Sequence, residues 1–281
     1  MKKTTNSFLN LRLSRLFIVA VPLMILALSS CKKDEPNDTP DTPDTPADVT
    51  VKDICGNTYK CVKIGEQYWM AENLRCNNYD TESGRAGDAL KTTEDIISYA
   101  PYYADASDKS KWNETIYTKN LTLSDDQISK LGYLYNWAAA VGLEDEAAAK
   151  QQTKPFDKQI QGICPNGWHV PTKAEWEALG VALGGAKDKD GSFPGIGKKL
   201  KTTSGWYDNG NGTDDCLFAA LPTGYAYGSK IADAGARTFF WTANPEDGAT
   251  SYLYILAYNS DLLEHFSNNK YLGYSVRCVK N

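Results

Sequence analysis

The sequence predicts an α+β domain with helices mainly in its first half and short antiparallel strands at both ends. Three observations predict this class. A strand-like stretch of alternating residues opens the globular part, one helix carries a complete capping signal, and short strand-like segments separated by Gly, Asn and Asp turns follow it. Because strands occur at both ends, we expect the N- and C-terminal strands to lie in one sheet.

The first strand-like stretch is residues 51–71. Gly56 begins a turn signal, and side chains of alternating character follow it. Val62 and Ile64 are apolar on alternate positions, so we expect them to face the core and Cys61 to face away from it.

The middle of the chain combines long loops with short helices. Residues 77–119 are polar with little periodicity, which is typical of loops. Ser124 with Gln127 three residues later matches a capping box and predicts a helix. Residues 133–141 predict a second helical segment, and the alanine-rich residues 144–150 a third.

The clearest helix is predicted over residues 171–185. Thr172 stands at the N-cap, Glu175 closes the capping box, and Gly184 ends the helix. One apolar face is formed by Trp176, Leu179 and Leu183. Strands are then expected at 217–221, 238–242, 251–257 and 274–280.

Residues 1–30 have the features of a signal peptide and are left out of the fold. Four basic residues precede an uncharged apolar run of 13 residues, which is too short for a comfortable membrane span. The run ends at Leu28-Ser29-Ser30-Cys31, which resembles a bacterial lipoprotein box. That resemblance implies diacylation of Cys31 and anchoring to membrane lipid. The alternative is an ordinary signal peptide followed by a chance cysteine.

Residues 31–48 form a linker between this anchor and a domain at 49–281. Repeated Asp-Thr-Pro units contain nothing to bury and favour an extended spacer. Lys32-Lys33-Asp34-Glu35 resembles the export signal that sends lipoproteins of gut and oral anaerobes to the outer face of the outer membrane. We therefore expect a lipid-anchored outer-membrane protein that faces outside the cell; a generic solvated charge run is the alternative.

The charge balance argues against nucleic-acid binding. The chain carries a net charge of −5, and residues 1–30 contribute +4, so the charge without them is −9. An acidic protein has no basic excess to neutralise phosphates. We expect no nucleic-acid partner.

Lipidation of Cys31 leaves six of the seven cysteines: Cys55, Cys61, Cys76, Cys164, Cys216 and Cys278. An even number in an exported chain predicts up to three disulfides. Only two histidines and no CxxC pair are present, so a zinc cluster is not expected.

Several motifs together resemble the FISUMP family, the Fibrobacter succinogenes major paralogous domain. They lie in the family's order over residues 51–281: GNTY (56–59), WMAENL (69–74), GYLYNW (132–137), GICPNGWHVP (162–171), FAALPTG (218–224), FWT (240–242) and GYSVRCV (273–279). The resemblance implies one domain with a C-type-lectin-like fold. Residues 167–172 with Glu175 and Trp176 are also similar to a motif of formylglycine-generating enzymes, which share that fold.

The resemblance also bears on the disulfides. Cys164 and Cys278 lie in family motifs, which implies that they pair. Cys55, Cys61, Cys76 and Cys216 stand outside the family pattern; they leave room for two further bridges, with three possible connectivities, and their pairing stays open.

We expect no enzymatic activity. An enzyme of the formylglycine-generating type needs a reactive cysteine pair near its C-terminal region, and only Cys216 and Cys278 lie there, with Cys278 in a motif expected to be structural. No Gly-x-Ser-x-Gly motif occurs. His169 is interpreted as a structural histidine beside a helix start, and His265 as a surface residue.

Residues 208–215 (DNGNGTDD) are rich in oxygen ligands and resemble a calcium loop in composition. Asp208, Asn211 and Asp214 are the candidate ligands, but EF-hand spacing is missing, so Asn-Gly turns are the favoured interpretation. We expect no cofactor, with calcium as the alternative.

Aromatic residues give the main hint of binding. All 7 Trp and 17 Tyr lie after Val49, and such side chains suit stacking on carbohydrate and protein interfaces. The candidates in loop-like contexts are Tyr102, Tyr103, Trp112, Tyr225 and Tyr227. We expect a non-enzymatic, lectin-like domain for an extracellular glycan or protein. The alternatives are a structural subunit of a surface fibre or envelope complex, and a degenerate formylglycine-generating-like enzyme.

Overall fold

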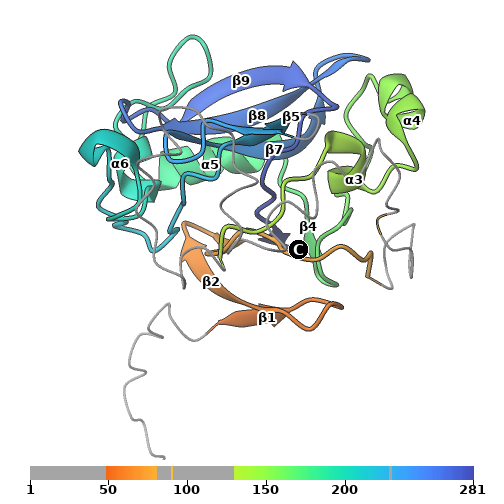
Figure 1. Ribbon diagram of the computed structural model, residues 1–281, viewed down its shortest axis with the longest axis horizontal. Helices are drawn as coiled ribbons and strands as arrows, with labels where there is room; N and C mark the ends of the chain where they lie inside the picture. Colours follow the sequence, from red (N-terminus) through yellow and green to blue (C-terminus); the bar gives the residue numbers. More distant parts are fainter. Residues whose placement is uncertain (1–48, 81–89, 91–129, 228–229) are drawn as a thin grey trace, which may run out of the picture. The chain divides into compact units, whose positions relative to one another are not determined.

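Two antiparallel sheets form the framework of the chain in the computed structural model (Figure 1). The structure describes residues 49–80, 90, 130–227 and 230–281, all within the unit Pro43–Asn281. The predictions for the signal peptide 1–30, for Cys31 and the linker 31–48, and for a helix from Ser124 lie outside these residues. The mixed α+β class with mostly antiparallel strands is confirmed.

The first sheet joins the two ends of the domain. Its strands lie in the order β1-β2-β3-β10-β4. Val279 of the last strand pairs with Trp69 on one side and with His169 on the other. The expectation that the terminal strands share one sheet is therefore confirmed. The strands are β1 (Thr50–Lys52), β2 (Thr58–Ile64), β3 (Gln67–Met70), β4 (Trp168–His169) and β10 (Val279–Lys280).

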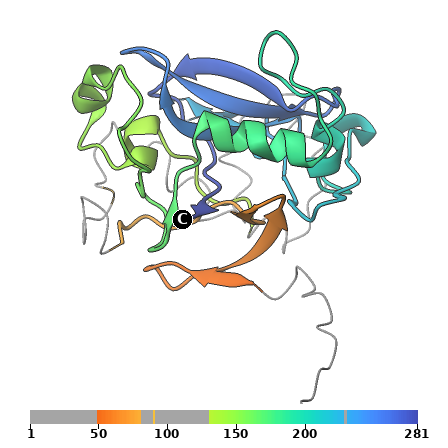
Figure 2. The same ribbon diagram turned by 180° about the vertical axis from the view of Figure 1, so that it is seen from behind.

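The second sheet consists of three strands in the order β7-β8-β9, and a separate hairpin is formed by β5 and β6. Helix α5 packs against this sheet, as Figure 2 shows. The strands are β5 (Tyr225–Tyr227), β6 (Lys230–Ala232), β7 (Arg237–Pro245), β8 (Thr250–Ala257) and β9 (Glu264–Asn269). The helices are α3 (Trp137–Val141), α4 (Glu146–Gln151), α5 (Lys173–Ala182) and α6 (Gly197–Leu200), with a short 3-10 turn at Tyr207–Asn209.

Helix α5 begins as its sequence predicts. The backbone N–H of Glu175 donates to Thr172 Oγ1 at 3.3 Å, and the Glu175 carboxylate accepts from the Thr172 backbone N–H at 2.7 Å. This reciprocal pair is a capping box. The apolar face then buries Trp176 and Leu179 against the second sheet.

Strand β2 is covered on both faces, which contradicts the expectation that Cys61 faces away from the core. Tyr59 and Cys61 belong to one buried cluster, while Val62 and Ile64 belong to another. Cys61 is 2% exposed. Alternating side-chain character indicates that the two faces of a strand differ, but it does not exclude burial of both faces. The expectation for Cys61 was wrong for this reason.

The strand expected at 217–221 is absent, and its place is taken by a loop that holds a buried arginine. Leu217 and Ala219 have positive φ, which interrupts an extended strand. The loop carbonyls of Phe218 and Ala219 accept hydrogen bonds from Arg277, whose guanidinium also lies 4.4 Å from the Phe218 ring centroid. Arg277 is 1% exposed and thus needs these acceptors.

Lys270 is a second buried cation that is held without a carboxylate. Its ammonium donates to the carbonyls of Ala149, Gln152 and Asp247 and lies 4.5 Å from the Trp137 ring centroid. These bonds join the end of α4 to the turn between β7 and β8.

Across the part of the chain that the structure describes, no helix has the length and apolar character to cross a membrane.

Candidate functional site

The two faces of the β7–β8–β9 sheet have different surroundings. Phe239 of β7 pairs with Ile255 of β8, and Ile255 pairs with Glu264 of β9, so these three side chains share one face. Because side chains alternate along a strand, Arg237, Phe266 and Asn268 point to the same face.

The opposite face is occupied by helix α5. Its Trp176 lies with ring centroids 5.4 Å from Phe240 and 5.2 Å from Tyr254. Both partners are completely buried. Helix α5 therefore covers this face of the sheet. Part of the opposite face, which contains Phe239, is not covered and lines a pocket.

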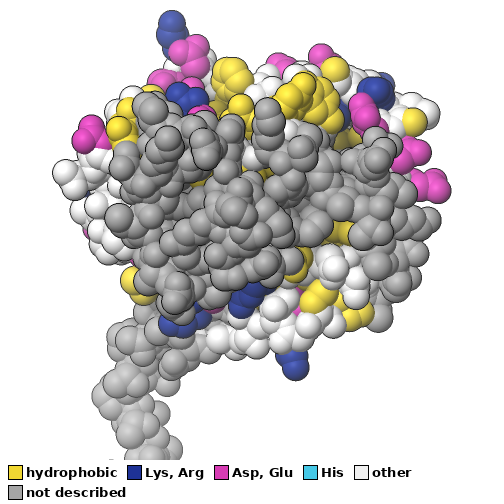
Figure 3. Space-filling model, viewed as in Figure 1, with side chains coloured by type: hydrophobic (Ala, Val, Ile, Leu, Met, Phe, Trp, Pro, Cys, Tyr) yellow, Lys and Arg dark blue, Asp and Glu magenta, His cyan; other side chains and the backbone are white. Residues whose placement is uncertain are grey.

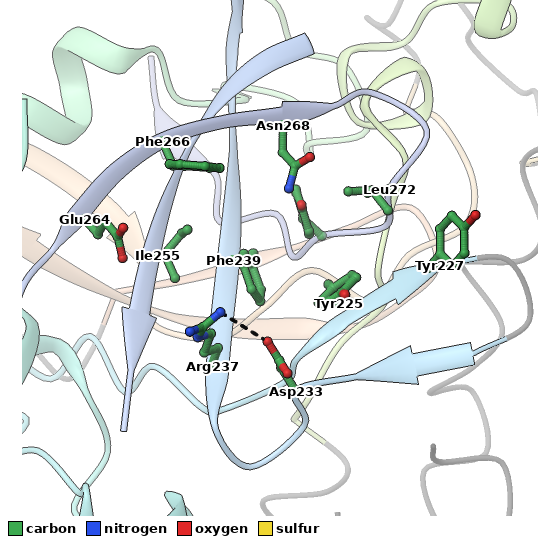
Figure 4. Close-up of a pocket in the computed structure, with 11 residues that line it drawn as sticks. Tyr225, Tyr227, Asp233, Arg237, Phe239, Ile255, Glu264, Phe266, Asn268 and Leu272 are labelled. Atoms are coloured by element: carbon green, nitrogen blue, oxygen red, sulfur yellow. Dashed lines mark hydrogen bonds and ion pairs between the residues drawn. The ribbon is translucent and has the colours of Figure 1, made fainter. Parts of the chain in front are cut away.

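A pocket of about 490 Å³ lies on the open part of the Phe239 face (Figure 4). Its volume is in the range of small-molecule sites. The sheet contributes Arg237, Phe239, Ile255, Glu264, Phe266 and Asn268; the hairpin and the turn after it contribute Tyr225, Tyr227 and Asp233; the segment after β9 contributes Leu272 and Tyr274.

Three aromatic rings form the floor of the pocket. Phe239 and Tyr274 are stacked with centroids 5.0 Å apart, and Tyr225 meets Phe239 edge to face at 5.3 Å. Phe239 and Tyr274 are buried, and Tyr225 is half-buried. Burial raises the pKa of both Tyr225 and Tyr274, so each hydroxyl stays neutral and can donate a hydrogen bond.

Polar groups surround this floor. Arg237 donates to Asp233 at 3.5 Å, and burial raises the pKa of Asp233 while Arg237 opposes that change. Asn268 forms a side-chain hydrogen bond with Tyr274, which opposes the burial effect on the Tyr274 pKa. Glu264 lies beside Phe266 at one side of the pocket in Figure 4. The site thus combines an apolar floor with carboxylate, amide and guanidinium groups.

The rim of the pocket exposes large aromatic side chains. Phe266 is 49% exposed and Tyr227 is 58% exposed. Hydrophobic side chains reach the surface on the side of the molecule where β9 lies (Figure 3). Exposed aromatic groups next to a concave site are typical of ligand-binding surfaces.

The structure brings together two of the predicted aromatic candidates. Tyr225 and Tyr227 both line the pocket. Tyr102, Tyr103 and Trp112 lie outside the described residues.

Two of the candidate calcium ligands, Asn211 and Asp214, take part in turn hydrogen bonds, as the favoured interpretation of this segment expects. Asn211 Oδ1 accepts from the Trp206 backbone N–H at 3.0 Å, and Asp214 Oδ1 accepts from the Ala219 N–H at 2.7 Å. Asp208 has a left-handed backbone, with φ of 49°. These bonds are what Asx-type turns provide, and they direct the oxygens of Asn211 and Asp214 to the backbone.

Cys164 and Cys278 are joined by a disulfide, as the family resemblance implies. Of the other four cysteines, Cys55 and Cys76 form a second bond. Asp53 lies within 4.8 Å of these two sulfurs, but a disulfide lacks the thiolates that bind metal. The Cys55–Cys76 bond holds the turn between β1 and β2 to the segment after β3, and the Cys164–Cys278 bond holds the residue before β10 to the loop before β4.

Only one of the two bridges that these four cysteines allow is therefore formed, and Cys61 and Cys216 are free. Cys61 belongs to one buried cluster, whereas Cys216 packs against the other. Burial raises the pKa of Cys61 to about 12 and that of Cys216 to about 11, so both remain thiols at neutral pH.

The two histidines have different environments. His169 is 1% exposed, with Nε2 2.7 Å from the Glu175 carboxylate and Nδ1 2.8 Å from Asn281 Oδ1. These contacts tie β4 to the start of α5 and to the chain end. His265 is half-buried, and its ring is stacked on that of Tyr252 with centroids 5.1 Å apart.

Sequence reasoning missed the polar half of the site. Strand β9 was not predicted, because Glu264-His265-Phe266-Ser267-Asn268 contains one apolar residue in five. With a single apolar residue there is no alternation of apolar and polar side chains, so the local sequence contains no signal for this strand. Asp233 and Arg237 are four residues apart in the sequence, at a turn. This spacing is common in turns and helices that bind no ligand, so it did not indicate a site.

Searches among curated proteins and among solved structures gave no match for this chain. One family model does match: that of the Fibrobacter succinogenes major domain, over residues 62–280. The match runs from within β2 to β10, and it therefore includes the β7–β8–β9 sheet, the Cys164–Cys278 disulfide and every residue that lines the pocket, whereas β1 lies outside it. It spans well over half of the sequence, and the chain belongs to the Fibrobacter succinogenes major domain family.

Proposed function

We propose that this chain is an outer-membrane lipoprotein with a non-enzymatic, lectin-like domain that binds an extracellular glycan through the pocket on the Phe239 face. One observation carries the proposal: an aromatic floor of Tyr225, Phe239 and Tyr274 lies next to carboxylate, amide and guanidinium groups, which are of the kinds that hydrogen-bond hydroxyls. Sugar rings have an apolar face and a polar edge, and such a site offers a partner for each.

A C-type-lectin-like fold is part of the proposal. It is supported by the terminal strands in one sheet and by the disulfide from Cys164 to Cys278. Fold alone gives no ligand, so the pocket carries the argument for binding.

A non-enzymatic role is supported by the state of the cysteines. Cys278 is bonded to Cys164, and Cys216 is a thiol of raised pKa that donates to the Lys199 carbonyl. A reactive cysteine instead needs an electropositive environment that lowers its pKa.

A glycan array tests the binding proposal. The full chain in detergent should bind a subset of a broad panel, and the double variant Glu264→Ala/Asn268→Ala should lose about tenfold in affinity, since each hydrogen bond contributes about 0.5–1.5 kcal/mol. Glu246→Ala, an exposed substitution outside the pocket lining, is the matched control and should bind like the parent. Failure of the parent chain to bind any member of the panel would contradict the glycan proposal.

Cell fractionation tests the anchor. The parent chain should partition with the outer membrane, and Cys31→Ser should lose membrane attachment because two acyl chains provide it. Added protease should digest the parent chain on intact cells. Protection in intact cells, with digestion after lysis, would place the domain on the inner side and contradict surface display.

A further inference from the structure

The pocket is longer than the part of it that is lined by the aromatic floor of Tyr225, Phe239 and Tyr274. In Figure 4, Glu264 and Phe266 lie at one end, Tyr227 lies at the other, and Tyr225 and Phe239 lie between them. The volume of about 490 Å³ belongs to this elongated space. A ligand that fills it has to be extended.

An exposed aromatic pair continues the site past the Tyr227 end. Tyr271 lies outside the pocket lining, and its ring centroid is 6.1 Å from that of Tyr227. Tyr271 is 40% exposed and directly precedes Leu272, which lines the pocket. The two exposed rings are inclined at 51° to each other and offer a second apolar surface next to the first.

The charge of the pocket favours an uncharged ligand. The lining holds two carboxylates, Asp233 and Glu264, and one guanidinium, Arg237. Arg237 is paired with Asp233, whereas none of the described cations forms an ion pair with Glu264. A carboxylated sugar would therefore meet an unbalanced like charge, which costs binding energy.

We infer that the site takes an uncharged oligosaccharide of at least two units, one over the Tyr225–Phe239 floor and the next over the Tyr227–Tyr271 pair. This inference rests on the proposed function of glycan binding. Glu264 accepts hydroxyl hydrogen bonds at the end opposite to Tyr227 and selects against acidic sugars.

The test uses the full chain in detergent and a panel of neutral mono- to tetrasaccharides, each with a uronic acid counterpart. Neutral disaccharides should bind more tightly than their monosaccharides, and the acidic counterparts should bind more weakly. Tyr271→Ala should reduce affinity for disaccharides and longer chains by roughly three- to tenfold, as expected for the loss of one aromatic contact, and leave monosaccharides unchanged. Glu264→Gln should raise the binding of the acidic members relative to the neutral ones.

Leu217→Ala is the matched control, since Leu217 is 52% exposed and lies outside the pocket lining. Equal affinity for mono- and disaccharides, or an equal loss for both in Tyr271→Ala, would overturn the two-unit site while leaving glycan binding intact. Preference of the parent chain for acidic members would overturn the charge argument. Absence of binding to the whole panel would count against the proposed function itself, and with it this inference.

Discussion

His265 lies directly behind the pocket, on the strand that supplies Glu264 and Phe266. Its Nδ1 is 3.0 Å from the Asp190 carbonyl oxygen, which can only accept, so Nδ1 carries the proton. Its Nε2 is buried and has no hydrogen-bond partner among the described residues. Burial lowers the pKa of His265 and Lys173 adds to this effect, whereas the hydrogen bond to Asp190 and the charges of Glu177 and Glu246 oppose it; the net direction is downward.

The environment of His265 predicts that acid destabilises the domain. The pKa in the folded state lies below the ordinary value of 6.5, so the unfolded chain binds the proton first as the pH falls. Stability should therefore fall below about pH 6.5 and continue to fall until the folded pKa is passed. His265→Asn keeps a donor near the position of Nδ1 and does not titrate, so urea unfolding of this variant should show a weaker decline from about pH 7.5 to about pH 5.5. The same decline in both proteins would show that His265 is not the source.

At the residue scale, sequence reasoning found the aromatic part of the site and missed its polar part. Tyr225 and Tyr227 stood out because bulky amphipathic side chains occur in a loop-like segment. Arg237, Glu264 and Asn268 looked like ordinary surface residues, because only the register of β7, β8 and β9 places them on one face. Register depends on pairing between segments that are distant in the sequence, which local patterns do not contain.

At the element scale, the capping box of α5 predicts a measurable contribution to stability. Thr172→Ala removes the hydroxyl that accepts from the Glu175 backbone N–H and donates to the Glu175 carboxylate, and it should lower the free energy of unfolding by about 1 kcal/mol. Thr172→Ser keeps the hydroxyl and should retain most of that energy. Urea denaturation of the three proteins measures the difference. Equal losses in the two variants would mean that the methyl group, rather than the cap, is responsible.

The elements that the sequence predicted correctly are those with strong local signals. Helices α4 and α5 have side-chain N-caps, and β7 and β8 are runs of apolar residues. The failed strand at 217–221 is apolar too, but its conformation is set by Arg277, about 60 residues further along, which takes its carbonyl groups as acceptors. A tertiary contact of this kind overrides local propensity.

On the scale of the whole molecule, the high tryptophan content is mostly structural. Six of the seven tryptophans are buried; Trp112, the remaining one, lies outside the described residues. Their rings pack against one another, as Trp69 and Trp176 do at 4.8 Å, or cover the buried ammonium of Lys270, as Trp137 does. Composition alone could not separate these core rings from the tyrosines that reach the pocket, because both serve as large amphipathic side chains.

The central claim is that the pocket on the Phe239 face is where the ligand binds. The most direct measurement is a crystal structure of the chain with a neutral oligosaccharide selected on the array. The account predicts one sugar ring over Tyr225 and Phe239, a second ring against Tyr227 and Tyr271, and a hydroxyl within hydrogen-bond distance of Glu264. A glycan bound on another face, with this pocket free of it, would contradict the account.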